Sequence, residues 1–196
     1  MDNARGLKSL LSAAAVLALI ALDQWAKHLA VVHLKGQMAV SLIRDILELL
    51  YVENMGAAFG IMNGMRLIFV LLPPVVSAVL IYVYLRMPAG RRFLPARICC
   101  IGIIAGALGN WIDRLRQGYV VDFIYFKPID FPVFNVADIY VTCSAFLIIF
   151  LLIFYYKEEE ISQIPLLGSD KSEPAAGTGK DNKNAGEGKD TDKKEM

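Results

Sequence analysis

Two acidic residues interrupt strongly apolar sequence in the second half of the chain, Asp122 in "GYVVDF" and Asp138 in "FNVAD". Between them lies "YFKPIDFP", in which Pro128 and Pro132 exclude a continuous helix and let the chain turn back. The two carboxyl groups can therefore converge although they lie 16 positions apart. Two carboxyl groups in a site of low dielectric constant do not both ionise easily, so such a pair holds one proton and offers an acid and a base together.

Further polar residues have the spacing of a shared helix face. Asn110, Asp113 and Arg114 are related by three and four positions, and Asn135 and Asp138 by three. Two polar faces can therefore meet beside the pair of carboxyl groups.

Other kinds of catalytic site find little support in the sequence. There is no H-E-x-x-H motif, and His28 and His33 are the only histidines, too few for a usual zinc site. No G-x-S-x-G, P-loop or G-x-G-x-x-G motif occurs, and Cys99, Cys100 and Cys143 lack the paired spacing of a metal site or a disulfide framework. We therefore expect carboxylate chemistry without a metal or another cofactor.

The elements that must position these groups are membrane helices. The 196 residues are 56% hydrophobic with a mean hydropathy of +0.49, which is too apolar for an ordinary soluble domain. Nucleic acid is not an expected partner, because no block of basic residues interleaved with aromatic ones appears. Four segments are long and apolar enough to cross a bilayer: about Leu7 to Val32, Leu67 to Leu85, Leu94 to Ile112 and Phe134 to Tyr156.

The basic residues predict the orientation. Arg5 and Lys8 precede the first segment, and "RMPAGRRFLPAR" between the second and third holds four Arg and no acid, so both lie on the cytoplasmic side. Both termini are then cytoplasmic, and the carboxyl groups face the outer leaflet. A cleaved signal peptide is the alternative for the N-terminus, but the small residues of "SAAAV" lie inside the apolar run rather than after it, which favours a retained helix.

The chain divides into a membrane domain over residues 1–160 and a hydrophilic tail over residues 161–196. The tail is rich in Lys, Asp, Glu, Gly and Ser and lacks aromatic residues, so it buries too little apolar surface to offset the entropy of ordering. We expect a disordered cytoplasmic extension, either dispensable or with a function of its own.

Within the apolar segments, and apart from their cytoplasmic ends, charged residues are confined to the outer half of the membrane. An ionisable group inside a membrane is costly and marks a functional site by default, although for Asp23 an ion pair with Lys27, four positions on, is a serious alternative. A transporter would need polar groups at successive depths, and a membrane scaffold would leave Asp122 and Asp138 without a task. A transporter fits poorly, because four stretches carry no charged residue: 9–20, 67–85, 98–109 and 143–156. A scaffold fits poorly because it leaves the two aspartates unexplained.

Five motifs together resemble one family, bacterial lipoprotein signal peptidase (signal peptidase II). The resemblance spans nearly all of residues 1–156, and the motifs are "DQWAK" (23–27), "NMGAAFG" (54–60), "GALGNWIDR" (106–114), "GYVVDF" (118–123) and "FNVAD" (134–138). It implies an intramembrane aspartyl endopeptidase of the bacterial inner membrane that cuts lipid-modified prolipoproteins before the diacylglyceryl-cysteine. Prolipoproteins and membrane lipids would be the partners, and nothing demands more than a monomer.

The resemblance also assigns residues and a fold. It implies that Asp122 and Asp138 are the catalytic dyad, acting through water, and that the fold is mainly α, with four transmembrane helices and a small extracytoplasmic β-cradle and short helix from about residues 36–66. "NMGAAFG" fits close contact with a ligand, or simply a tight turn. The supporting positions are Asp23, Asn54, Gly56, Asn110, Asp113, Arg114 and Asn135.

Overall fold

The computed structural model describes residues 2–56 and 66–167 of the chain. Within this part, four helical segments are long and apolar enough to cross a membrane, which agrees with the prediction. They are built from α1 (Asp2–Leu34), α2 (Arg66–Arg86), α3 (Leu94–Gln117, after a 3-10 turn at Arg91–Phe93) and α4 (Val136–Phe150), which continues as a π-helical turn over Leu151–Tyr155.

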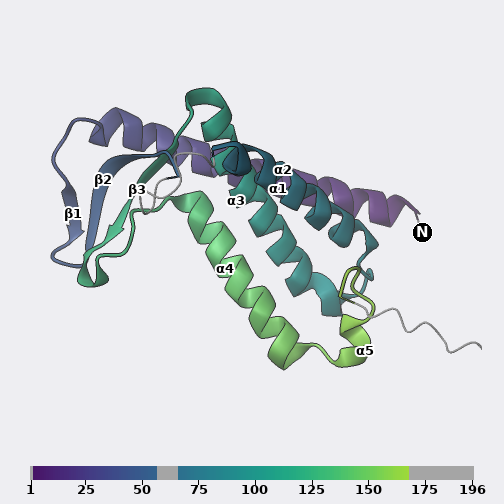
Figure 1. The fold of residues 1–196 in the computed structure, drawn as a ribbon. Coiled ribbons are helices and arrows are strands. Elements are labelled where there is room, and N and C mark those ends of the chain that lie inside the picture. The colour runs from purple at the N-terminus through teal and green to yellow at the C-terminus, as the bar shows by residue number, and fades with distance from the viewer. Residues whose placement is uncertain (1, 57–65, 168–196) are drawn as a thin grey trace, which may run out of the picture.

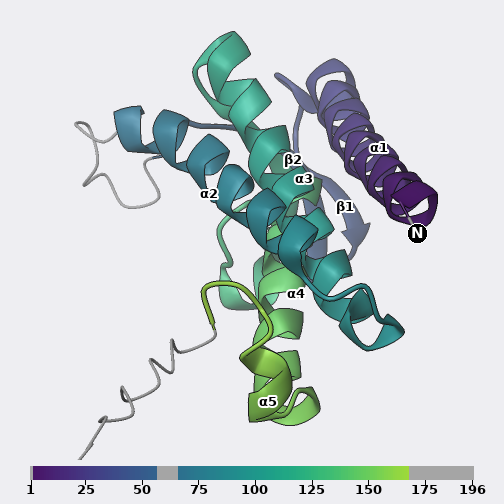
Figure 2. The ribbon, with the colours of Figure 1, turned by 90° about the vertical axis from the view of Figure 1, so that its right-hand side faces the viewer.

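Helix α3 occupies the centre and contacts α1, α2 and α4. Figure 2 shows α2 crossing α3 on one side, with α1 on another. Close approach of α3 to α4 depends on glycine, because a Cβ atom at Gly106 would lie 2.7 Å from Val141 Cγ2. Small residues at such positions are the usual means by which membrane helices pack tightly.

A three-stranded antiparallel sheet lies at the end of the molecule where α1 ends and α4 begins (Figure 1). Its order is β1 (Val40–Ile43), β2 (Leu47–Asn54) and β3 (Val120–Phe126). The register of β2 and β3 places Val52 opposite Asp122 and Asn54 opposite Val120. The end of β2 therefore lies beside Asp122.

The sheet is larger than the predicted cradle. Strand β3 comes from outside residues 36–66, because "VVDFIYF" is rich in β-branched and aromatic residues that suit a strand. The short helix that the resemblance implies is not found in residues 36–56, and residues 57–65 lie outside the described part of the chain.

Helix α3 also continues five residues past the predicted end at Ile112. It ends at Gly118, which adopts φ 83° and donates its N–H to Arg114 O at 3.1 Å. A left-handed glycine is a common helix stop, whereas the charged residues before it are compatible with a helix. Asp113 and Arg114 thus lie on the last turns of a helix, and exposed Arg116 is helical rather than part of a loop.

The end of the molecule opposite the sheet is held by apolar packing. A short helix, α5 (Glu158–Ile161), follows the π-helical turn, and Ile164 beyond it is 3% exposed. The hydrophilic tail predicted from residue 161 therefore begins later in the described chain, because Ile164 packs into this core; residues 168–196 lie outside the described part. The apolar cluster consists of Met87, Phe93, Ala96, Cys99, Cys100, Ile104, Leu151, Tyr156 and Ile164.

Candidate active site

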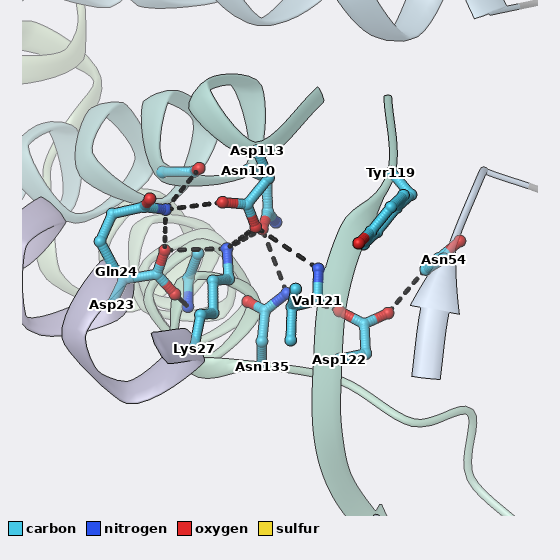
Figure 3. Close-up of polar contacts among 12 residues, drawn as sticks. Asp23, Gln24, Lys27, Asn54, Asn110, Asp113, Tyr119, Val121, Asp122 and Asn135 are labelled. Atoms are coloured by element: carbon cyan, nitrogen blue, oxygen red, sulfur yellow. Dashed lines mark hydrogen bonds and ion pairs between the residues drawn. The ribbon is translucent and has the colours of Figure 1, made fainter. Parts of the chain in front are cut away.

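Asp122 is buried on β3 with only 1% of its surface exposed. Its Oδ1 accepts a hydrogen bond from Asn135 Nδ2 at 2.6 Å, and its Oδ2 accepts one from Asn54 Nδ2 at 2.8 Å (Figure 3). Asn54 is itself oriented by the backbone, because its Oδ1 accepts from Gly56 N at 2.8 Å. Gly56 adopts φ 87°, a conformation that glycine takes at little cost. The end of β2 thus turns so that an amide N–H faces Asp122.

Asp138 lies in the first turn of α4 and forms a capping box with Asn135. Asn135 Oδ1 accepts from Asp138 N at 3.1 Å, and Asp138 Oδ2 accepts from Asn135 N at 3.1 Å. The other oxygen, Oδ1, accepts from Asn110 Nδ2 at 2.8 Å. Asp138 therefore accepts one N–H group on each carboxyl oxygen, at the N-terminus of α4.

Asn135 connects the two aspartates. Besides capping α4, it donates from Nδ2 to Asp122 Oδ1 at 2.6 Å and to Asn110 Oδ1 at 3.1 Å. Among the described residues no hydrogen bond joins Asp122 to Asp138 directly. The two carboxyl groups are linked through the amide side chains of Asn135 and Asn110, which hydrogen-bond to each other and to one carboxyl group each.

The chain returns through the proline-containing segment after β3. Phe134 N donates to Ile124 O at 3.0 Å, and Ile124 N donates to Phe134 O at 2.9 Å. This isolated bridge brings residue 134 back beside the strand. Asn135 follows at once, which explains how it reaches Asp122 on the strand.

A buried ion-pair network lies beside the aspartates. Lys27 Nζ is 2.8 Å from Asp23 Oδ2 and 2.8 Å from Asp113 Oδ2, and it donates to Asn110 Oδ1 at 2.7 Å. Asp23, Lys27 and Asp113 are 0%, 3% and 4% exposed. The ion pair proposed for Asp23 is present, and Asp23 also accepts from Ala137 N at 2.9 Å through Oδ1. Helix α1 thereby holds the first turn of α4, which carries Asp138.

Three contributors to this network are absent from the predicted site. Gln24 donates from Nε2 to Asp113 Oδ1 at 2.8 Å and to Gly109 O at 3.2 Å. Lys27 was expected to pair only with Asp23, and its spacing gave no sign of Asp113. Gly109 leaves room for Asp23, because a Cβ atom there would lie 2.7 Å from Asp23 Oδ2. The sequence offered one signal for Gln24, which is that this polar residue directly follows Asp23.

Arg114 has a weaker connection than the other predicted residues. Its guanidinium Cζ lies 5.3 Å from the centre of the Phe69 ring. Among the described residues its side chain forms no hydrogen bond or ion pair. Its assignment as a supporting residue therefore stays a prediction.

Burial controls the protonation of Asp122. Loss of solvent raises the pKa of its carboxyl group from 3.8 to about 6, with a smaller contribution in the same direction from Asp138. The amide groups of Asn54 and Asn135 act in the opposite sense by stabilising the carboxylate. Asp122 thus exchanges its proton close to neutral pH, as an acid or base in catalysis must.

Metal ligands do not cluster in the described part of the chain. No group of three or more His, Cys, Asp or Glu side chains there is placed to hold a metal ion. His28 and His33 are exposed on α1, Cys99 and Cys100 are buried in the apolar cluster, and Cys143 is exposed on α4.

Comparisons with known proteins agree on one family. A family model described as signal peptidase (SPase) II matches residues 15–154. The lipoprotein signal peptidase of Streptococcus thermophilus (strain CNRZ 1066) is 40% identical over 146 residues, covering 74% of this chain and 92% of that protein. The lipoprotein signal peptidase of Halothermothrix orenii is 42% identical over 147 residues, covering 74% and 95%. A solved bacterial membrane enzyme superposes with a TM-score of 0.67 at 30% identity, covering 74% and 94%.

Proposed function

The chain belongs to the signal peptidase II family and is therefore a membrane protease that removes signal peptides from lipoproteins; we propose that its catalytic groups are the aspartates Asp122 and Asp138. The observation that supports this most strongly is the chain of amide hydrogen bonds through Asn135 and Asn110. It fixes two carboxyl groups from β3 and α4 at one place. The proposed class is thus an aspartic endopeptidase that activates water without a cofactor.

The two aspartates have different surroundings and are assigned different roles. Burial raises the pKa of Asp122 to about 6, so this group holds a proton readily and is assigned the role of the acid. Asp138, held by N–H groups from Asn135 and Asn110 at the start of α4, is assigned the role of the base.

The reaction follows from this division. Asp138 takes a proton from water as the water attacks the scissile carbonyl carbon, while protonated Asp122 donates a hydrogen bond to the carbonyl oxygen. The roles reverse when the leaving amine takes a proton. No covalent intermediate with the protein is required.

The remaining residues position the pair or contact the substrate. Asn54, held by Gly56, orients Asp122. Lys27 and its partners Asp23 and Asp113 fix α1, α3 and α4 relative to one another. None of these three groups needs to react, because the contacts that they make already occupy them.

We propose that both termini are cytoplasmic and that the site faces the periplasmic leaflet of the inner membrane. The support is the Arg-rich connection between α2 and α3, at the opposite end of α3 from Asp113. In this orientation the acyl chains of a diacylglyceryl-cysteine stay in the lipid while the bond before that cysteine reaches the aspartates. The enzyme would act as a monomer, because each proposed catalytic group comes from the same chain.

The test is cleavage of a lipid-modified preprolipoprotein by purified protein. Asp122→Asn and Asp138→Asn should each reduce the rate by about 10³-fold or more, because each removes a proton-transfer group. Asp45→Asn is a matched control, since Asp45 is exposed and lies on the β1–β2 turn. Substantial cleavage by either dyad variant would overturn the assignment.

A chelator distinguishes this mechanism from metal-dependent hydrolysis. Treatment with EDTA should leave the cleavage rate unchanged. Activity lost with EDTA and restored by zinc would contradict an aspartyl mechanism.

A further inference from the structure

A second polar site lies at the end of the molecule opposite the aspartates. The start of α1, the end of α2 and the start of α3 line a cavity of about 400 Å³, with Lys8, Arg86 and Arg97 among its lining residues. A further hollow of about 400 Å³ also has Lys8 and Arg97 in its lining and adds Arg91. No acidic side chain lines either cavity. The described lining therefore has a clear excess of positive charge.

An apolar cavity of about 380 Å³ adjoins the basic one. The two cavities share Ser9, Tyr84 and Leu85 in their linings. Where they meet, the Ser12 Oγ and Tyr84 Oη atoms lie 2.5 Å apart in a hydrogen bond that joins α1 to α2. The apolar part runs between the helices along Val16, Ile81, Leu85, Ile101, Ile104 and Leu108.

The guanidinium of Arg97 is fixed in the lining of both basic cavities. Its Nη2 donates to Met87 O at 2.9 Å and to Pro88 O at 2.7 Å, which holds the guanidinium in place. Its Nε is buried and has no hydrogen-bond partner among the described residues. Because Nε is closed off, a ligand would contact the part of the guanidinium that lines the cavity, and an anionic oxygen is the acceptor that a guanidinium binds best. The first turn of α3, which contains Arg97, has no acidic residue to compete with such an anion.

We propose that this end of the protein binds an anionic glycerophospholipid, with the phosphate at Lys8 and Arg97 and one acyl chain in the apolar cavity. Both cavities are within the usual size range of ligand sites, about 300–1,000 Å³. Basic pockets between transmembrane helices bind anionic headgroups in this way. The basic cavity suits the charged headgroup of a lipid, and the adjoining apolar cavity suits its acyl chain.

Charge complementarity decides against the signal peptide as the occupant. A signal peptide carries a positively charged segment before its apolar run. Lys8, Arg86 and Arg97 would repel that segment at the mouth of the cavity. An anionic lipid has the opposite charge and is present in the surrounding bilayer.

The experiment is native mass spectrometry of the purified full-length protein in detergent, titrated with phosphatidylglycerol or phosphatidylethanolamine. We expect one phosphatidylglycerol to bind in preference to the zwitterionic lipid. Arg97→Gln should weaken that binding by about tenfold, as expected for the loss of one charge-assisted hydrogen bond. Ala13→Phe should weaken it to a similar degree by filling the apolar cavity, of which Ala13 is a lining residue.

Matched controls separate the site from general effects of charge or size. Arg44→Gln changes an exposed arginine on the β1–β2 turn, and Ala18→Phe adds a ring on the exposed side of α1; both should bind lipid as the wild type does. Because Ala13→Phe leaves Arg97 and its carbonyl contacts intact, it tests the site even if Arg97→Gln disturbs folding.

The outcomes are distinct from those for catalysis. Asp122→Asn should retain lipid binding while it loses cleavage, so failure of either proposal is visible alone. Equal binding of the two lipids, or unchanged binding by Ala13→Phe, would overturn the lipid site. Displacement of bound lipid by a synthetic signal peptide would also overturn it, by assigning the cavity to the substrate.

Discussion

The two ends of helix α3 are held by different kinds of contact. Toward its start, Ala96, Cys99 and Ile104 are buried in the apolar cluster, where contacts are non-directional. Toward its end, half-buried Asn110 and buried Asp113 contact charged and amide groups from α1, α4 and β3. One helix therefore combines a packed end with an end in which each polar atom depends on a particular partner.

This difference has an energetic consequence. Apolar packing loses stability gradually as atoms are removed, because the remaining contacts persist. A buried polar network loses more when one member is removed, because the partners stay buried without compensation. We therefore expect substitutions at the polar end to affect stability and cleavage together, and those at the apolar end to affect stability alone.

The largest effect should come from Lys27→Met. It leaves Asp23 and Asp113 buried without their shared cation, and breaking a buried pair costs about 3–5 kcal/mol of unfolding free energy. Cleavage should fall with it, because Asp23 holds the first turn of α4. Thermal unfolding in detergent and the cleavage assay measure both effects. Lys35→Met is the control, since Lys35 pairs with Glu53 at the surface, and an equal response in both variants would refute the network's role.

A smaller effect on stability, with none on chemistry, is expected from Leu151→Ala at the apolar end. Leu151 is 5% exposed, and the cavity left should reduce the unfolding free energy by about 2–3 kcal/mol. The cleavage rate per folded molecule should stay at the wild-type value. Leu147→Ala, at a position 42% exposed, should cost less. A slower Leu151→Ala enzyme would show that the two ends are not independent.

The polar end should also make the unfolding free energy depend on pH, through Asp122. Its pKa is raised from 3.8 to about 6, so the folded protein holds this proton more tightly than the unfolded chain does. The stability from this group is complete below about pH 4 and is lost as the pH rises to about 6. Between about pH 5 and about pH 7.5 we expect a loss of about 1 kcal/mol.

Thermal unfolding across this pH range checks the sign. Asp122→Asn should remove this part of the pH dependence, whereas Asp45→Asn should keep it. If wild type and Asp122→Asn showed the same profile, Asp122 would not titrate as its burial implies.

The smallest expected effect is the coupling between Gln24→Ala and Asp113→Asn in a double-mutant cycle. Gln24 donates directly to Asp113, so the two losses of stability should differ from additivity by about 0.5–1 kcal/mol. Gln24→Ala combined with Leu151→Ala, at opposite ends of the molecule, should be additive. Additivity in both cycles would mean that the polar end does not behave as a unit.

Sequence alone predicted the parts of this fold that depend on local pattern. The four apolar segments, the shared face of Asn110 and Asp113, and the turn after β3 all follow from spacing, hydropathy and proline. The motifs that carry the family resemblance added the assignment of Asp122 and Asp138 as a dyad, which stays a prediction.

Other features depend on contacts between distant segments and had no local signal. Asp113 joins Lys27 across 86 positions, and no spacing rule relates them. Strand β3 needed β2 beside it before its apolar, β-branched run could be distinguished from the surrounding helical sequence. Ile164 falls in the segment predicted as tail, and its burial depends on packing against the distant residues of the apolar cluster.

The hydrogen bond from Ala137 N to Asp23 also orders events during synthesis. Its two residues are separated by 114 positions, so at the usual rate of roughly 5–20 residues per second the ribosome takes roughly 6–23 seconds to make the second after the first. During that interval Asp23 has Lys27 as its charged partner, and Lys27 also pairs with Asp113 once that residue is made. Asp138 is made one residue after Ala137 and lies on the same first turn of α4. If Asp122 and Asp138 are the catalytic pair, as proposed, we expect no cleavage by a growing chain until Asp138 has been made.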